Sequence, residues 1–294
     1  MAYRLHYSLL RPGAGRSVLF TRQARSEALD EKWLDSAALR GDDNAAPESW
    51  TRCFFSLLDL HLGRNAPTLD AMSEAIPFES ARRAMVDYQI RRRGIRDAKV
   101  LEAMFQVPRH EFVPGAYLSS AYDDRPLPIG ESETISQPYI VAAMTAAVRV
   151  QPGEKALEIG AGSGYQAAIL AYLGARVWTV ERNGQLADAA RERLARLDYE
   201  GIEVICGDGT EGYPSAAPYQ VIVVTAASPH VPQPLLDQLD DGGRMVIPVG
   251  DLYHQDLQLI FKRAHELTTR NLDPCQFVPL IGKHAWPERG ERVW

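Results

Sequence analysis

The stretch from Lys155 to Tyr165, KALEIGAGSGY, constrains the fold of this chain more than any other. A short apolar run ends in an acid, three glycines follow at every second position, and a helix-like run from Gln166 to Leu173 comes next. This order predicts a strand, a tight turn and a helix. Glycines allow positive φ and close approach of a ligand to the main chain, and amides at a helix start attract electron-rich groups. The stretch therefore predicts a nucleotide-binding loop.

The acid in this loop indicates which nucleotide it binds. A dinucleotide or triphosphate would bring negative charge close to Glu158, two residues before Gly160, and the carboxylate would repel it. The ammonium of an amino acid would be attracted. S-adenosylmethionine carries an ammonium and no phosphate, so it fits this pattern better than NAD does. We expect Glu158, Gly160, Gly162 and Gly164 to contact it, although a structural turn or a dinucleotide loop of different spacing also produces glycine patterns of this kind.

Strand and helix patterns alternate after the loop. Strands are expected at 176–180, 202–206, 219–225 and 244–249, with helices at 185–197 and 232–239. This alternation predicts an α/β fold with a doubly wound, mostly parallel sheet that binds ligands at the carboxyl ends of its strands. Residues 256–263 and 275–280 read as antiparallel closing strands, which are typical of the Rossmann-like methyltransferase fold.

Two further acids follow strands of this predicted sheet. Glu181 lies 21 residues after Gly160, a distance that suits a carboxylate accepting both ribose hydroxyls. Asp208, before Gly209, could accept from an adenine amino group. Each could instead cap a helix or lie in a solvated turn.

The region before the loop divides into two parts. Residues 1–71 begin rich in arginine and poor in acids, and only 50–62 show helical spacing. They could be a transit peptide, a poorly ordered extension or the product of a start codon placed too far upstream. Residues 72–294 form the predicted catalytic domain, with helices from Phe78 to Gly94, at 99–105 and at 140–148. Ser136, before the last of these helices, could simply cap it, and His110 is expected to be a packing residue.

Composition excludes several classes of partner. The net charge of −6 and the pI near 5.7 argue against nucleic acid. No apolar run has the length of a membrane span, and the three cysteines lack metal-ligand spacing. We therefore expect a soluble, cytoplasmic protein, a monomer, that binds no metal, membrane or nucleic acid.

Eight stretches together resemble one family, the protein-L-isoaspartate O-methyltransferases. They are Thr134–Tyr139 (TISQPY), Leu157–Gln166, Val180–Arg182, Gly207–Gly209, Val223–Ala227, Leu239–Gly243, Ile247–Gly250 and Phe277–Leu280 (FVPL). The first and last are the most specific of them, and they appear in the order of the family between about residue 80 and residue 285. Residues 1–71 have no counterpart in it.

The resemblance implies an activity and a set of site residues. It implies methyl transfer from S-adenosylmethionine to the free carboxylate of L-isoaspartyl residues in damaged proteins and peptides, after which the ester closes to a succinimide and opens partly to normal aspartate. It makes Ser136 the active-site serine. It adds Thr134, Ile135 and Gly209 to the cofactor site, and it assigns Gln137, Val278 and Pro279, with Ser136, to the substrate.

The chemistry explains why a serine is sufficient. A sulfonium and a carboxylate combine into neutral products, so a site that excludes water and aligns the reactants accelerates transfer, and the acceptor is already ionised at neutral pH. Ser136 would orient this carboxylate; were a base needed, His230 is the first candidate. The competing hypotheses are a methyltransferase for another carboxylate, a catalytically silent adaptor and an NAD-linked oxidoreductase.

Overall fold

The computed structural model describes residues 2–10, 17–25 and 78–287. The chain divides into two units, Met1–Pro67 and Thr68–Trp294. In the first unit, β1 (Ala2–Leu10) pairs antiparallel with β2 (Ser17–Arg25). The sequence analysis expected no strands here, although apolar and polar residues alternate along β1, a pattern typical of strands. The predicted helical stretch at 50–62 lies outside the described residues.

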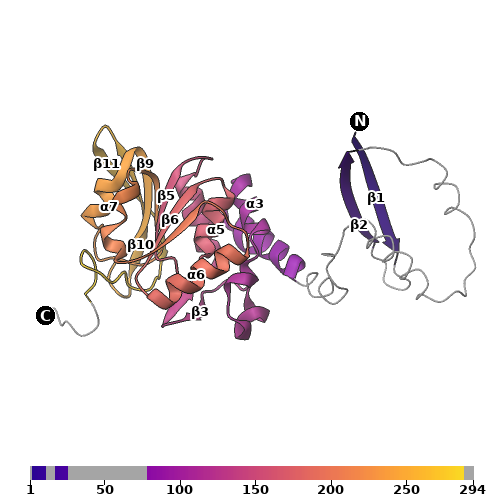
Figure 1. Ribbon diagram of the computed structural model, residues 1–294, viewed down its shortest axis with the longest axis horizontal. Coiled ribbons are helices and arrows are strands. Elements are labelled where there is room, and N and C mark those ends of the chain that lie inside the picture. Colours follow the sequence, from indigo (N-terminus) through magenta and orange to yellow (C-terminus); the bar gives the residue numbers. More distant parts are fainter. Residues whose placement is uncertain (1, 11–16, 26–77, 288–294) are drawn as a thin grey trace, which may run out of the picture. The chain divides into compact units, whose positions relative to one another are not determined.

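The second unit is built on a seven-stranded sheet (Figure 1). Its strands, in spatial order, are β11 (Glu266–Cys275), β10 (Gln255–Arg263), β9 (Leu239–Gly250), β8 (Tyr219–Val224), β5 (Lys155–Ile159), β6 (Arg176–Glu181) and β7 (Ile202–Cys206). The five strands from β9 to β7 run parallel, whereas β10 and β11 run antiparallel to their neighbours. The predicted fold class, a doubly wound Rossmann-like sheet with antiparallel closing strands, is confirmed.

Helices cover both faces of this sheet. They are α3 (Ala98–Gln106), α4 (Pro138–Val148), α5 (Tyr165–Tyr172), α6 (Gly184–Arg196) and α7 (Gln233–Gln238). A further helix spans 78–93 through the π-helical η3 (Met85–Ile90) and the 3-10 turn η4 (Arg91–Arg93), and it ends at Gly94 with φ of 102°. Short 3-10 turns complete the unit: η5 (Arg109–Phe112), η6 (Gly115–Ser120), η7 (Gly209–Glu211) and η8 (Pro214–Ala216).

Alternate strand residues fill two separate cores. Val221 and Val223 of β8 pack with residues of α4 and α5, while Ile222 and Val224 pack with Leu235 of α7. A parallel strand that is buried on both faces reads as a continuous apolar run. This is why β8 was predictable from its sequence.

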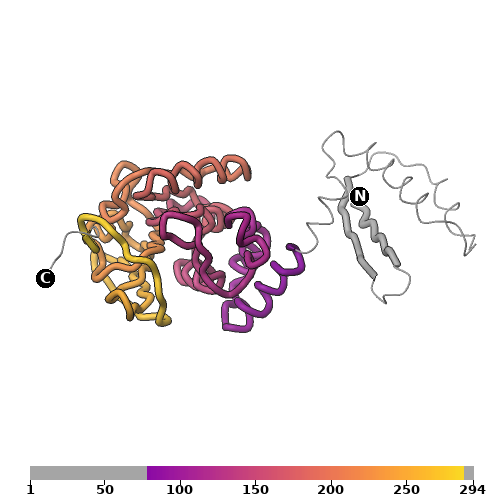
Figure 2. The backbone as a smooth tube through the Cα atoms, turned by 90° about the horizontal axis from the view of Figure 1, so that it is seen from below, coloured from indigo at the N-terminus to yellow at the C-terminus, as the bar shows by residue number. Residues whose placement is uncertain are grey.

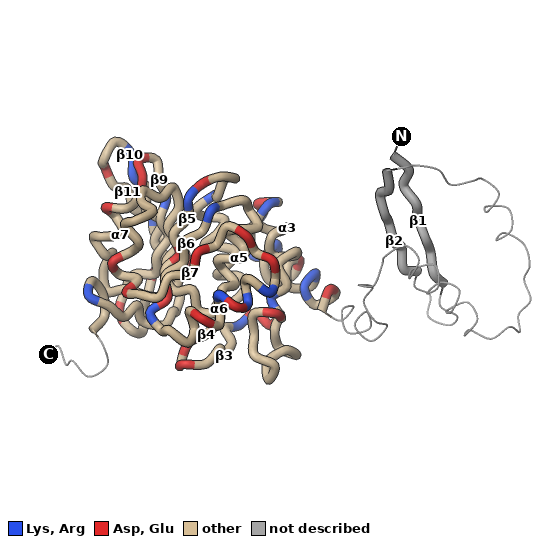
Figure 3. Tube along the Cα trace, in the orientation of Figure 1, with Lys and Arg blue, Asp and Glu red and all other residues tan. Residues whose placement is uncertain are grey.

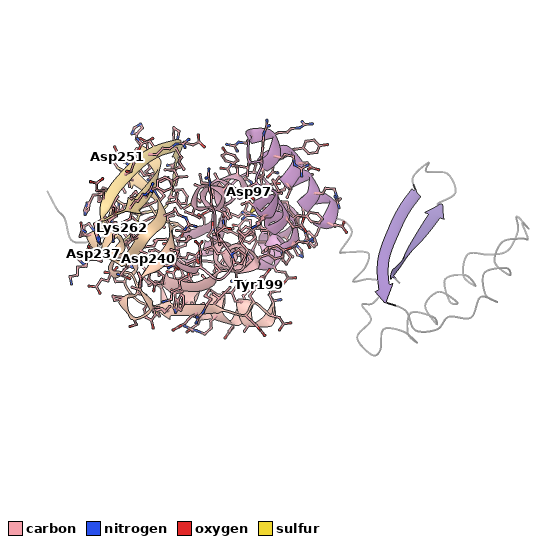
Figure 4. The ribbon with its side chains drawn as sticks, turned by 90° about the horizontal axis from the view of Figure 1, so that it is seen from above. Asp97, Tyr199, Asp237, Asp240, Asp251 and Lys262 are labelled. Carbon is pink, nitrogen blue, oxygen red and sulfur yellow. The ribbon has the colours of Figure 1, made fainter. Side chains whose placement is uncertain are left out.

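Asp97 and Lys262, labelled in Figure 4, each bind the backbone at the end of a helix. Asp97 accepts hydrogen bonds from the amides of Lys99 and Val100 at the start of α3 and so caps that helix. Lys262 of β10 donates to the carbonyls of Leu236 and Leu239, at 2.9 and 2.7 Å, where α7 ends. The cation therefore satisfies carbonyls that the helix itself leaves open.

The segment before α4 forms a short hairpin. β3 (Leu127–Gly130) pairs with β4 (Glu133–Ile135) through Glu131 and Ser132, which have φ of 51° and 62°. Positive φ at both turn residues is the geometry of tight hairpin turns. Asparagine or glycine usually marks such turns, and neither occupies these two positions, so the turn gave no sequence signal.

Two predicted boundaries are wrong. Residues 275–280 are not the final strand, because β11 occupies Glu266–Cys275 and the chain beyond it only bridges to Ala227, whose amide donates to the carbonyl of Val278 at 2.8 Å. β11 was missed because it is an exposed edge strand with polar residues on both faces, so it shows no alternation. The helix expected at 140–148 begins at Pro138, and its N-cap residue is Gln137 rather than Ser136.

Candidate active site

The three glycines of the loop between β5 and α5 adopt the left-handed conformation. Gly160, Gly162 and Gly164 have φ of 94°, 50° and 86°. A Cβ on Gly160 would lie 2.5 Å from the hydroxyl oxygen of Thr225, which is itself 2.7 Å from the Gly160 carbonyl oxygen. The loop is therefore held close against the end of β8, and side chains at these positions would disrupt it.

A cavity opens beside this loop, at the carboxyl ends of the parallel strands. The space inside it, which opens to solvent, amounts to about 760 Å³. It brings together ten of the residues that the sequence analysis assigned to a site: Thr134, Ile135, Ser136, Glu158, Gly160, Gly162, Glu181, Gly209, Val278 and Pro279. Three others, Gly164, Gln137 and Asp208, do not line it.

Glu181 ties the cavity to the glycine loop. One carboxylate oxygen accepts from the amide of Gly162 and the other from the amide of Asn183, both at 2.9 Å. Each carboxylate oxygen can accept more than one hydrogen bond. Glu181 therefore shapes the loop and retains acceptor capacity toward the cavity.

Glu158 is a buried carboxyl group on the cavity wall. Its side chain is fully buried, and neither oxygen has a hydrogen-bond partner among the described residues. Burial raises its pKa to about 8; the nearby Thr179 hydroxyl lowers it somewhat and the charge of Glu181 raises it further. An unpartnered buried carboxyl group is costly, and a cationic ligand group in the cavity would remove this cost.

Gln166 is a second buried acceptor, which the sequence analysis did not assign to the site. Its amide nitrogen donates to the Thr145 hydroxyl at 3.0 Å, and that hydroxyl donates to the Val141 carbonyl at 2.7 Å. The amide oxygen of Gln166 is left without a partner among the described residues. Of the buried unpartnered side chains in the described region, only those of Glu158 and Gln166 also line the cavity.

Asp208 has a local structural role. It caps η7 by accepting from the amide and hydroxyl of Thr210, and its other oxygen accepts from the amide of Lys283 at 2.8 Å. These hydrogen bonds lower its pKa, although partial burial acts against them. Gly209, the next residue, does reach the cavity, where a Cβ would lie 2.5 Å from the Ile159 side chain.

Ser136 lies where two cavities meet. Its side chain is half-buried, and its hydroxyl has no hydrogen-bond partner among the described residues. Besides lining the first cavity, it lines a second one of about 1470 Å³, which we call the outer groove and which Thr134, Thr225 and Val278 also line. Gln137 lines only the outer groove and donates to the Asp124 carbonyl at 3.0 Å.

The histidines considered in the sequence analysis lie away from both cavities. His230 is exposed and lines neither of them. His110 stacks on Phe78, with 4.2 Å between ring centroids, and its Nδ1 lies 2.7 Å from the Tyr122 hydroxyl. Within residues 78–287 and the hairpin strands, no cluster of acids, histidines or cysteines could hold a metal ion. No helix in this described part is long and apolar enough to cross a membrane.

Fold and cavity together define a class of protein. A sheet of this order with a glycine loop at the end of β5 is the Rossmann-like fold of S-adenosylmethionine-dependent methyltransferases. The residues present fit that cofactor, because the buried, unpartnered acceptors of Glu158 and Gln166 line the cavity and could bind its ammonium group.

Comparison with known proteins identifies the family within this class. The family described as protein-L-isoaspartate(D-aspartate) O-methyltransferase matches residues 80–285. The chain belongs to this family. A protein-L-isoaspartate O-methyltransferase from Methanoculleus marisnigri is 57% identical over 213 residues, which are 72% of this chain and 97% of that protein, and one from Methanoregula boonei is 54% identical over 73% of this chain and 99% of its own length.

Solved structures show the same likeness. A protein-L-isoaspartate O-methyltransferase superposes with a TM-score of 0.64 and 30% identity over 69% of this chain and 67% of its own. A Plasmodium falciparum protein, described as a candidate member of the family in complex with S-adenosyl-L-homocysteine, has a TM-score of 0.60 and 26% identity over 69% of this chain and 98% of its own. This chain is thus an enzyme that transfers a methyl group from S-adenosylmethionine to the free carboxylate of L-isoaspartyl residues in damaged proteins.

Proposed function

We propose that this repair methyltransferase positions its acceptor carboxylate with Ser136. The observation that supports this most directly is the unpartnered Ser136 hydroxyl at the junction of the cavity and the outer groove. In this arrangement the cofactor occupies the cavity and the damaged peptide enters along the outer groove. Gln137 and Val278 contact the peptide in the groove, Pro279 contacts its isoaspartyl end from the cavity side, and Ser136 donates a hydrogen bond to the isoaspartyl carboxylate.

The reaction needs orientation more than proton transfer. When bound, the cofactor supplies a methyl group on a positively charged sulfur, and the carboxylate that accepts it is ionised at neutral pH. Because opposite charges disappear during transfer, a site that excludes water favours the reaction. The residues of the chain therefore act by holding both partners in line. This agrees with the absence of any described histidine from the lining of the two cavities.

The cofactor-binding residues divide by the part of the cofactor they would hold. Glu158 would accept from the ammonium, because its carboxyl group is buried and unpartnered. Glu181 would accept from the ribose hydroxyls with its remaining lone pairs, and Gly209 would lie beside the adenine, held there by the Asp208 cap of η7. Thr134 and Ile135 would close the cavity from the hairpin side, and Gly160, Gly162 and Gly164 would keep the loop clear of side chains.

Methylation of paired peptides tests this function. The two peptides have one sequence and differ only in an isoaspartyl or an aspartyl linkage, and transfer of label from the cofactor is measured. We expect methylation of the isoaspartyl peptide alone. Equal methylation of both peptides would show that the groove does not distinguish the two linkages and would remove the assignment.

We further propose that the enzyme works as a monomer in the cytoplasm, without a nucleic-acid or membrane partner. Its net charge is −6, and in the described part of the chain basic and acidic residues are interspersed (Figure 3). Residues 72–294 would then be the catalytic domain and 1–71 an extension to it. Sedimentation at several concentrations would reveal any association.

A further inference from the structure

The outer groove is lined by segments that are distant in the sequence. Arg93, at the end of the N-terminal helix, and Asp273, near the end of β11, both line it, together with Ser136 and Tyr139. Figure 2 colours the first of these segments purple and the last yellow, which shows how far apart they lie in the sequence. The outer groove is open to solvent and extends from Ser136 to Arg93 and Asp273, so residues flanking the isoaspartyl group can occupy it as well.

Three side chains form a connected row in this groove. The Arg93 guanidinium lies 3.4 Å from the centre of the Tyr139 ring, and the Tyr139 hydroxyl donates to a carboxylate oxygen of Asp273 at 3.2 Å. Tyr139 is in the first turn of α4, three residues after Ser136. The row therefore connects the helix that follows the active-site serine with the closing strand of the sheet.

Of the two charged side chains in this row, Arg93 has an ion-pair partner and Asp273 has none among the described residues. The Arg93 guanidinium forms an ion pair with Asp124 at 3.0 Å, so its charge is already compensated. Asp273 is exposed, has only the neutral Tyr139 hydroxyl as a partner, and forms no ion pair with any described residue. Asp256 of β10 is also exposed, and it pairs with Pro274, the residue after Asp273. Burial chiefly, and then the charges of Asp256 and Asp273, raise the pKa of Cys275 to about 12. The lining of the groove therefore carries one uncompensated carboxylate, that of Asp273.

We propose that Asp273 is a specificity-determining residue that favours isoaspartyl peptides with a lysine or arginine close to the damaged residue. The proposal rests on the peptide lying in the outer groove, as the proposed function has it. A cation next to the isoaspartyl group would face the uncompensated carboxylate of Asp273, whereas an acidic neighbour would be repelled. Because the contact is remote from the reacting atoms, it should act on binding and be expressed in KM rather than in kcat.

Kinetics on a set of matched peptides tests this. Each peptide carries one isoaspartyl residue and a single lysine, glutamine or glutamate placed one or two residues to either side. For at least one placement we expect the lysine peptide to have a KM about two- to fivefold below that of the glutamine peptide, the size of an exposed ion pair. The glutamate peptide should have a higher KM, and added salt should reduce the differences.

Variants assign the effect to one residue. Asp273→Asn keeps an acceptor for the Tyr139 hydroxyl and should remove most of the preference for lysine, and Asp273→Lys should reverse it. Glu266→Gln, which removes one negative charge from the other end of β11, is the matched control and should keep the preference. Equal KM values for all three peptides, or a lysine preference that survives Asp273→Asn, would overturn the proposal. If the glutamine peptide were methylated no better than its aspartyl counterpart, the proposed function itself would fail instead.

Discussion

At the scale of single residues, the site depends on polar groups that the protein itself leaves unpartnered. Buried polar atoms in folded proteins nearly always find a hydrogen-bond partner. Glu158, Gln166 and, at the junction of the two cavities, Ser136 lack one among the described residues. We propose that each of the three binds a ligand group, and each gives a prediction.

Replacing Ser136 by alanine should slow methyl transfer without preventing cofactor binding. A hydrogen bond to a charged group contributes about 1.5–3 kcal/mol, so we expect kcat on an isoaspartyl peptide to fall by about 10- to 100-fold. Affinity for S-adenosylhomocysteine, measured by calorimetry, should change little. Ser215→Ala, on the exposed turn η8, is the control. Full activity of the Ser136 variant would remove its proposed role, and a kcat that rises through neutral pH would indicate a general base instead.

The raised pKa of Glu158 predicts a proton release when the cofactor binds. With a pKa of about 8 the buried carboxyl group is largely protonated near neutral pH in the free enzyme, and an ammonium beside it favours the ionised form. Binding of S-adenosylhomocysteine should then release close to one proton. Titrations in two buffers of different ionisation enthalpy measure this number. Identical heats in both buffers would argue against the contact, and Glu158→Gln should abolish the difference.

The same pKa has a consequence for stability. The folded state holds the Glu158 proton up to about pH 8, whereas the unfolded state loses it near the ordinary value of 4.5. The folded state therefore binds more protons in this window, and the free energy of unfolding falls as pH rises through it. Denaturant titrations should show that Glu158→Gln, which has no proton to lose, flattens this part of the pH profile.

Gln166 should contribute to affinity only for ligands with an amino-acid end. If its amide oxygen accepts from the ammonium, Gln166→Met should weaken S-adenosylhomocysteine binding by about 5- to 10-fold, the value of roughly one hydrogen bond. Methylthioadenosine, which lacks the amino-acid end, should bind both proteins alike. Equal weakening for the two ligands would mean that the substitution disturbs the cavity in general.

The sequence indicated some of these residues and not others. The positions of Glu158 and Glu181 at the cavity were predictable. An acid before a glycine loop can attract an ammonium group, and an acid at the end of the next strand can accept from ribose hydroxyls. Gln166 was not, because a polar residue near a helix start gives no signal until its bond to Thr145 shows which way the amide points. Asp208 had two open interpretations, and the structure shows it capping η7.

At the scale of elements, the hairpin β3–β4 connects the loop with the start of α6. Asn183 accepts from the amides of Gln185 and Leu186 as the cap of α6, and its amide nitrogen donates to Glu131 at the tip of the hairpin at 3.2 Å. On the same hairpin, Ile129 lies 3.4 Å from where a Cβ of Gly162 would be. The hairpin therefore covers the glycine loop and carries Thr134 and Ile135 to the cavity.

Asn183→Asp separates the two roles of this residue. Aspartate caps a helix as well as asparagine does, but it has no donor for Glu131 and would repel it. We expect faster amide hydrogen exchange across residues 127–135 and weaker cofactor binding, with α6 unaffected. Asn183→Ala, which loses the cap as well, should add faster exchange at the start of α6. Unchanged exchange in the hairpin would show that its contact with Asn183 is unimportant.

At the scale of the whole molecule, periodicity made the buried parts predictable and the exposed parts less so. The strands β5, β6 and β8 are covered on both faces, so nearly all of their residues are buried and their sequences are continuous apolar runs. β11 has no such constraint, and the hairpin β1–β2 was missed although its first strand alternates. The order of the strands, in which β8 lies beside β5 rather than beside β7, was not predicted, because no single strand's sequence specifies its neighbour.

The last prediction concerns residues 1–71, which we expect to be dispensable. The family match begins at residue 80, and 72% of this chain covers 97% of the Methanoculleus protein, so a shorter chain suffices for the fold. A protein that starts at Met72 should therefore keep the activity and melting temperature of the full chain. As a control, a start at Arg96 removes Met85, Val86 and Ile90, which are buried in the core, and should destabilise the domain severely. A fall of more than about 4 °C for the Met72 protein, equivalent to about 1 kcal/mol or more, would show that the extension contributes to the stability of the catalytic domain.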